Sequence, residues 1–202
     1  MATLSSTDGE AWERLGGVVA AVVEPGLDPR VLGSRAVSGC SGWRLRALGP
    51  GLRRARRMAT ALAGSTALVL RTDVAAFYPS VTPRVLARAV RSAGVEPREA
   101  RRVADLLEGW GSEGYPGLPI GPHASAVMAN AVLRQADRAV ARFPFLRWMD
   151  DYLVAVPSQR AAVEVLDLLD AALAALGLSR SEPKTRVLEG RSRFRWLGAS
   201  VI

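Results

Sequence analysis

The chain has 202 residues, which fits one domain or one domain with a small appendage, and 49% of them are hydrophobic, enough for a sizeable core. Its single cysteine, Cys40, excludes a disulfide framework, and its single histidine, His123, argues against a histidine-rich metal site or a Ser-His-Asp triad. Of its 27 basic residues, 26 are arginine and the net charge is +8, which indicates a polyanionic partner such as nucleic acid, although GC-rich coding also favours arginine. The N-terminus does not resemble a signal peptide, and the apolar run at 16–23 is far shorter than the roughly 20 residues of a membrane span, so we expect a soluble cytoplasmic protein without a membrane partner.

The first part of the chain is strongly basic. Residues 29–72 contain no acidic residue and carry nine arginines. A solvated face usually carries both signs, so we expect these arginines to contact phosphate, with a plain exposed surface as the alternative. The candidates cluster around a Gly-Pro-Gly break at 49–51 and are Arg44, Arg46, Arg53, Arg54, Arg56 and Arg57.

Strands and helices then follow one another along the chain. An apolar run at 67–70 predicts a buried strand that ends just before Asp73. Residues 111–121 hold four glycines and two prolines and are expected to form a loop. Helical spacing predicts helices at 83–93, 97–110, 125–140 and 159–177, and short apolar runs predict strands at 143–149, 152–156, 185–188 and 194–202. This order predicts an α+β fold, an antiparallel sheet covered by helices on one face.

Three aspartates lie next to apolar runs, where burial of a charged carboxylate is energetically unfavourable. Asp73 ends a buried strand, while Asp150 and Asp151 lie between the two apolar runs of a predicted hairpin. Two carboxylates about 4 Å apart repel by roughly 4 kcal/mol at an effective dielectric near 20, so they must share protons or bind a cation such as Mg²⁺ or Mn²⁺. Adjacent strand residues face opposite ways, and we therefore expect Asp150 to be the main partner of Asp73, with Asp151 secondary. The alternative is that Asp-Asp merely forms a turn.

Five segments resemble, in order, the palm motifs of reverse transcriptases. They are RTDVAAFYPSV, GLPIGPHASAVMAN, FLRWMDDYLVAV, GLSRSEPKT and FRWLGASV, and together they cover roughly residues 67–202. The Leu-Pro-Ile-Gly-Pro form resembles the bacterial branch that includes abortive-infection and other phage-defence enzymes. The resemblance implies a polymerase palm at 63–202, preceded by a short, basic, fingers-like segment at 1–62.

The resemblance also implies a metal site. In this family the first motif supplies an aspartate and the backbone carbonyl of the next residue, here Asp73 and Val74. The third motif supplies Asp150 and Asp151. Together they are expected to hold two Mg²⁺ or Mn²⁺ ions, the usual device for in-line phosphoryl transfer.

Nucleotide-binding residues follow from the same motifs. Tyr78 holds the position of a ring that stacks under the sugar and clashes with a ribose 2′-hydroxyl, which favours dNTPs. Phe77 beside it is expected to pack inward. Gly121 and Ser125 match the segment that shapes the nucleotide and template pocket, and His123 is read as incidental or template-touching.

Lys184 is the only lysine in the chain. Relatives place a lysine here, near the pyrophosphate leaving group. A lysine can donate a proton and an arginine essentially cannot, so we assign Lys184 a general-acid or phosphate-positioning role, with a simple surface lysine as the alternative.

The resemblance therefore implies an RNA-directed DNA polymerase, a nucleotidyltransferase with an RNA template, a DNA primer and dNTPs as partners, and with a link to antiviral defence. The sequence ends directly after the last palm motif, so we expect no thumb, and a partner subunit or oligomer in its place. The alternatives are a catalytically silent palm-fold nucleic-acid-binding module, or an untemplated or protein-primed DNA polymerase.

Overall fold

The computed structural model describes residues 6–39, 42–192 and 194–201, so Cys40 lies outside the described residues. The chain forms two compact units, each assembled from separate segments. The first unit comprises Met1–Leu27, Ser34–Arg46 and Ala76–Arg134, and the second comprises Asp28–Gly33, Ala47–Ala75 and Gln135–Ile202. The division into a fingers-like segment and a palm stays a prediction. Among the described residues, no helix is long and apolar enough to cross a membrane.

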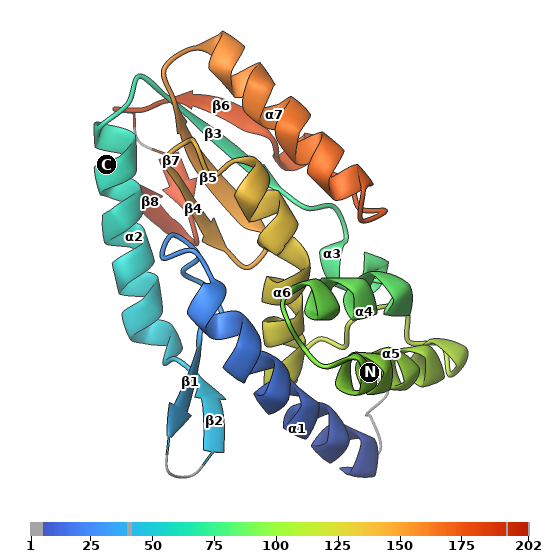
Figure 1. The fold of residues 1–202 in the computed structure, drawn as a ribbon. Helices are drawn as coiled ribbons and strands as arrows, with labels where there is room; N and C mark the ends of the chain where they lie inside the picture. Colours follow the sequence, from blue (N-terminus) through green and yellow to red (C-terminus); the bar gives the residue numbers. More distant parts are fainter. Residues whose placement is uncertain (1–5, 40–41, 193, 202) are drawn as a thin grey trace. The chain divides into compact units, whose positions relative to one another are not determined.

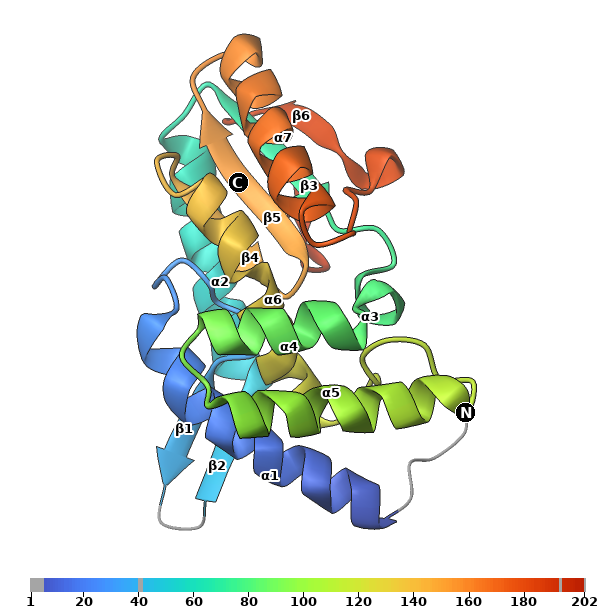
Figure 2. The ribbon, with the colours of Figure 1, turned by 45° about the vertical axis from the view of Figure 1, so that its right-hand side comes forward.

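The second unit is built on a four-stranded antiparallel sheet in the order β4-β5-β3-β6 (Figure 1, Figure 2). Its strands are β3 (Leu68–Asp73), β4 (Phe145–Trp148), β5 (Asp151–Val156) and β6 (Arg186–Glu189). The predicted buried strand is β3, which continues through Asp73, and the predicted hairpin is β4–β5. The β3–β5 register runs from Leu68 opposite Val156 to Asp73 opposite Asp151.

Helices cover the sheet, which confirms the predicted α+β fold class. On one face lie α7 (Gln159–Ala174) and the last residues of α6 (His123–Ala139) (Figure 2). On the other face, α2 (Leu48–Gly64) and the hairpin of β7 (Phe194–Trp196) and β8 (Ala199–Val201) complete an apolar cluster with Val69 and Leu153. The sheet therefore has a core on each side, one more layer than the sequence predicted.

Helix α2 was not predicted, because Gly-Pro-Gly at 49–51 resembles a break. In the structure these residues form the first turn of α2, where proline costs nothing because the first backbone N–H groups have no helical acceptor. The helix buries Ala55, Ala59 and Ala63, four residues apart, against the sheet. Small side chains at this spacing let the helix backbone approach the strands closely.

The first unit is mainly helical. Its elements are α1 (Ser6–Val23), η1 (Glu24–Gly26), β1 (Ala36–Gly39), β2 (Gly42–Leu45), α3 (Phe77–Ser80), α4 (Pro83–Ser92), α5 (Pro97–Ser112) and most of α6. Helices α4 and α5 confirm two predictions and pack on each other. Thr82 caps α4 by accepting a hydrogen bond from the Val85 N–H, with Pro83 at the first helical position. Helix α1 joins this unit through Trp12, whose ring meets Trp110 edge-on at 5.0 Å.

Candidate active site

The second unit gathers three carboxylates at one end of its sheet. Asp73 is the last residue of β3 and Asp151 the first of β5, and the register places them directly opposite each other. Asp150 precedes Asp151 in the β4–β5 turn. Asp73 is buried, whereas Asp150 and Asp151 are half-buried. The convergence follows from antiparallel pairing of β3 with β5. The expectation that Asp150 rather than Asp151 is the main functional partner of Asp73 stays a prediction.

These carboxylates repel one another. Burial raises the pKa of the Asp150 carboxyl, and the charges of Asp73 and Asp151 raise it further. Burial also raises the pKa of Asp151, while Arg71 opposes the rise and Asp73 adds to it. Burial is thus the main reason that both carboxyls hold their protons more tightly, and the neighbouring carboxylates add to it.

Two cations lie against the carboxylates. Lys184, in the 3₁₀ turn η2 (Glu182–Lys184), donates from Nζ to both oxygens of Asp73 at 3.0 Å. Its hydrogen bond to Asp73 raises the pKa of Lys184, so the ammonium stays charged across the neutral range. The Nε of Arg71 lies 3.4 Å from Oδ1 of Asp151, and its Nη1 donates to the carbonyl of Arg195 at 2.9 Å.

The position of Lys184 is set by its neighbours on the sheet. The Ser181 N–H donates to the backbone carbonyl of Asp73 at 2.7 Å. The hydroxyls of Thr72 and Thr185 lie 2.8 Å apart, and Arg180 donates to the Thr185 hydroxyl at 3.0 Å. Thr185 and Arg180 were missed by the sequence analysis, although both lie in the GLSRSEPKT segment that it singled out.

The donor chemistry fits a divalent cation. In the part of the chain that the structure describes, no three histidine, cysteine or acidic side chains stand arranged to hold a metal ion. The chemistry of the set nevertheless suits Mg²⁺ or Mn²⁺, because carboxylate oxygens are hard ligands and a cation would stabilise the charged form of Asp150, whose pKa is raised by burial and by the neighbouring carboxylates. Val74, whose backbone carbonyl is the predicted metal ligand, follows Asp73 directly and is buried. Its backbone forms an isolated antiparallel β-bridge with Arg180.

The predicted nucleotide-binding residues lie in the first unit. Phe77 is buried, as expected of a ring that packs inward, and meets the ring of half-buried Tyr78 edge-on at 5.6 Å. The Tyr78 carbonyl accepts a hydrogen bond from the Leu118 N–H at 2.8 Å. Gly117 packs so closely that a Cβ there would lie 2.2 Å from the same carbonyl. The structure thus joins the first and second sequence motifs around Tyr78.

Gly121 and Ser125 differ in their surroundings. Gly121 has φ +122° and open space where a Cβ would lie, so its backbone conformation, not a close neighbour, calls for glycine. Ser125 is buried in α6, and its hydroxyl accepts a hydrogen bond from Nε1 of Trp12 at 3.0 Å. This contact accounts for Ser125 as a packing residue, and its role toward a nucleotide stays a prediction.

The arginine cluster is divided between the units. Arg44 and Arg46 are exposed in the first unit, at β2 and just after it. The other four lie on α2 in the second unit, and Arg56 donates to the carbonyl of Leu197 at 2.9 Å. The exposed members of this second group are Arg53, Arg54 and Arg57.

An antiparallel sheet with acidic residues in one hairpin turn and at the end of the neighbouring strand is typical of the palm of nucleotide polymerases. The family model described as reverse transcriptase (RNA-dependent DNA polymerase) matches residues 29–201. The chain belongs to this family, and the match begins well before residue 67, so it includes α2 and the β1–β2 hairpin.

A solved structure with the same fold is the telomerase of Candida albicans in complex with a fragment of its telomeric RNA. The TM-score is 0.60 at 12% sequence identity, over 93% of this chain and 36% of the telomerase chain. This chain therefore spans about a third of that protein's length. No curated protein matches the sequence.

Proposed function

We propose that this chain is an RNA-directed DNA polymerase that adds dNTPs to the 3′-hydroxyl of a primer. The observation that carries the proposal is the gathering of Asp73, Asp150 and Asp151 at one end of the sheet, with Lys184 on Asp73. Membership of the reverse transcriptase family supports nucleotidyl transfer as the reaction class.

Asp73, Asp150, Asp151 and the carbonyl of Val74 would hold two Mg²⁺ or Mn²⁺ ions. When bound, these ions supply Lewis-acid activation of the primer hydroxyl and neutralise charge on the transferred phosphoryl group. In the reaction, the primer 3′-oxygen forms a bond to the α-phosphorus, the bond to pyrophosphate breaks, and the hydroxyl proton passes to solvent water. The carboxylates contribute by fixing the positions of the reacting groups.

Lys184 serves the leaving group in this proposal. Its side chain is 61% exposed, so the ammonium can leave Asp73 and reach a phosphate in solution. A lysine ammonium keeps its proton on Nζ at neutral pH, as a general acid or a phosphate-binding cation requires.

Substrate selection is assigned to the first unit. Tyr78 would exclude ribonucleotides, and Phe77 supports it from the buried side. The glycine-rich turn at Gly121, held to Tyr78 through Leu118, would border the nucleotide and template.

Nucleic acid would be bound through arginine. Arg53, Arg54 and Arg57 are exposed on α2, a helix without an acidic residue, which supports phosphate contact. The telomerase with the same fold was solved with RNA, which supports an RNA template for this chain. We further propose that a partner subunit or oligomer grips the duplex. We also propose a role for this chain in defence against phage, because its Leu-Pro-Ile-Gly-Pro segment resembles that of bacterial phage-defence reverse transcriptases.

The decisive assay incubates the full chain with dNTPs and Mg²⁺ or Mn²⁺, with and without a primed RNA template. The control is the Asp150→Asn/Asp151→Asn variant, which keeps side-chain volume and removes charge. Incorporation that needs the template and is lost in the double variant supports the proposal. Template-independent incorporation would assign the untemplated or protein-primed alternative, and RNA binding without incorporation would assign the silent module.

A further inference from the structure

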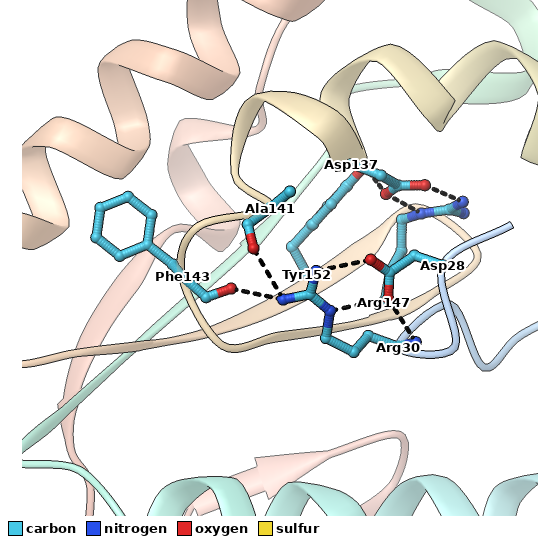
Figure 3. A network of polar contacts seen from close by, with 7 residues as sticks. All are labelled: Asp28, Arg30, Asp137, Ala141, Phe143, Arg147 and Tyr152. Carbon is cyan, nitrogen blue, oxygen red and sulfur yellow. Dashed lines mark hydrogen bonds and ion pairs between the residues drawn. The ribbon is translucent and has the colours of Figure 1, made fainter.

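A buried ion pair lies beneath the β4–β5 hairpin. Arg147 of β4 is fully buried, and its guanidinium binds Asp137 of α6 through two bonds, Nε to Oδ1 at 2.7 Å and Nη2 to Oδ2 at 2.8 Å (Figure 3). The Tyr152 hydroxyl donates to the same Oδ1 at 2.9 Å. Burial, together with the charge of Asp137, raises the pKa of Tyr152 well above its ordinary value, so this hydroxyl stays a donor.

The guanidinium also holds the turn itself. Nη1 of Arg147 donates to the backbone carbonyl of Met149 at 2.6 Å. Met149 has φ +55°, in the left-handed region that residues with a Cβ rarely adopt. The Met149 carbonyl and the Asp150 N–H belong to the same planar peptide group. A contact that fixes this oxygen therefore also fixes the orientation of the peptide plane that precedes the Asp150 Cα.

The opposite edge of β4 is braced by the segment at 30–33. The Arg147 N–H donates to the Arg30 carbonyl at 3.0 Å, and the Arg147 carbonyl accepts from the Leu32 N–H at 2.8 Å. Gly33 packs against the turn, since a Cβ there would lie 2.6 Å from the Met149 nitrogen.

This segment is itself held in place. Arg30 pairs with Asp28 and donates to the carbonyls of Ala141 and Phe143 (Figure 3). The turn that carries Asp150 is therefore held by the Arg147 side chain, while the backbone of residues 30–33 holds the free edge of β4.

Burying a paired charge gives little stability over an apolar pair of the same volume, so stability alone does not account for Arg147. We propose that Arg147 is a positioning residue: locked by Asp137 and Tyr152, it holds the Met149 carbonyl and thereby sets the orientation of Asp150. This inference rests on the proposed function only for its effect on catalysis, because the positioning itself is measurable without activity.

The test separates positioning from folding. The double variant Arg147→Met/Asp137→Val replaces the ion pair by apolar side chains of similar volume and keeps a core, but it removes the donor to Met149. Arg142→Lys is the control, because Arg142 pairs with Glu164 at the surface. Backbone hydrogen–deuterium exchange is measured over residues 148–152 of the full chain, with α7 as an internal reference.

We expect the double variant to keep the fold and to exchange about 10- to 100-fold faster in the hairpin alone, the factor expected from losing a hydrogen bond to a charged donor. Primer extension by the double variant should show a kcat lower by a similar factor and an unchanged KM for the dNTP. Exchange in the hairpin equal to that of Arg142→Lys would overturn the inference.

If the double variant does not fold, Tyr152→Phe decides. It removes the hydroxyl that donates to the Asp137 carboxylate, and Arg147 keeps both of its hydrogen bonds to Asp137. We therefore expect hairpin exchange about 3-fold faster, a smaller effect than in the double variant. Unchanged hairpin exchange in Tyr152→Phe overturns the inference. A wild-type chain that incorporates no dNTP contradicts the proposed function, whereas the exchange data still decide the role of Arg147.

Discussion

The ammonium of Lys184 lies 3.0 Å from each carboxylate oxygen of Asp73, so the only lysine of the chain is paired with the acidic residue that ends β3. Asp73 is buried while the Lys184 side chain is 61% exposed, so the lysine is the partner that a phosphate in solvent can reach. A proton donor or phosphate ligand in the proposed reaction needs this combination of a buried charge and an accessible one.

Replacing Lys184 should separate charge from proton donation. We expect Lys184→Ala to lower kcat for dNTP addition by about 10²–10⁴, the usual contribution of general acid catalysis. Lys184→Arg keeps the charge but cannot donate a proton at neutral pH, so it should recover binding of the triphosphate more than kcat. The measurement is single-turnover incorporation for both variants. Equal kcat in Lys184→Arg and wild type would leave Lys184 a phosphate ligand only.

Asp150 should be destabilising in the free protein. Burial and neighbouring charges raise its pKa, so the folded chain binds a proton more tightly than the unfolded chain. The stability of the fold therefore decreases as pH rises from the ordinary aspartate pKa through the raised one, and stays lower above it.

Asp150→Asn removes the charge, and we expect it to raise the Tm at pH 7 by about 2–4 °C, the shift that about 1 kcal/mol makes in a chain of this size. Incorporation should be lost at the same time. Thermal melts at pH 4 and pH 7 check this, because the stabilisation should shrink at the lower pH. A lower Tm at pH 7 would contradict the account.

Tyr78 should decide which sugar is accepted. We expect Tyr78→Ala to admit ribonucleotides, while Tyr78→Phe keeps the ring and the discrimination. Phe77→Ala should cost about 3–5 kcal/mol of stability, because Phe77 is buried, and should weaken sugar discrimination less than Tyr78→Ala does. Ratios of kcat/KM for dNTP and NTP measure the effect, and an unchanged ratio in Tyr78→Ala refutes the gate.

The exposed arginines of α2 should bind nucleic acid through its phosphates. Each substitution of Arg53, Arg54 or Arg57 by Gln should weaken RNA binding irrespective of sequence and reduce the slope of log K against log salt by about one. Arg160→Gln on α7 is the control, since Arg160 is also exposed. Salt titrations of RNA binding give the slopes. A slope that Arg160→Gln lowers as much as the α2 substitutions would leave no special role for α2.

Much of the second unit could be predicted because its signals are local. The apolar runs around Asp73 and Asp150 predicted β3 and the β4–β5 hairpin, and pairing of those strands was enough to bring the three acids together. Helix α2 was missed because proline and glycine in a first turn look, in sequence, like a break.

The contacts of single polar residues could not be predicted in the same way. Arg147 stands within an apolar run, and the partner that explains it, Asp137, lies on another element. The motif predicts Ser125 as a nucleotide-binding residue but gives no sign of its hydrogen-bond partner Trp12, which lies 113 residues away. Such pairs are set by packing of distant segments, which no local pattern encodes.

Templated single-nucleotide addition decides whether this chain is an RNA-directed DNA polymerase. Four RNA templates that differ only in the first unpaired base are annealed to one DNA primer and incubated with the full chain, Mg²⁺ or Mn²⁺ and each dNTP in turn. We expect addition of the complementary dNTP on each template, and none by Asp150→Asn/Asp151→Asn. Addition that ignores the template base, or no addition while the RNA is bound, would contradict this assignment.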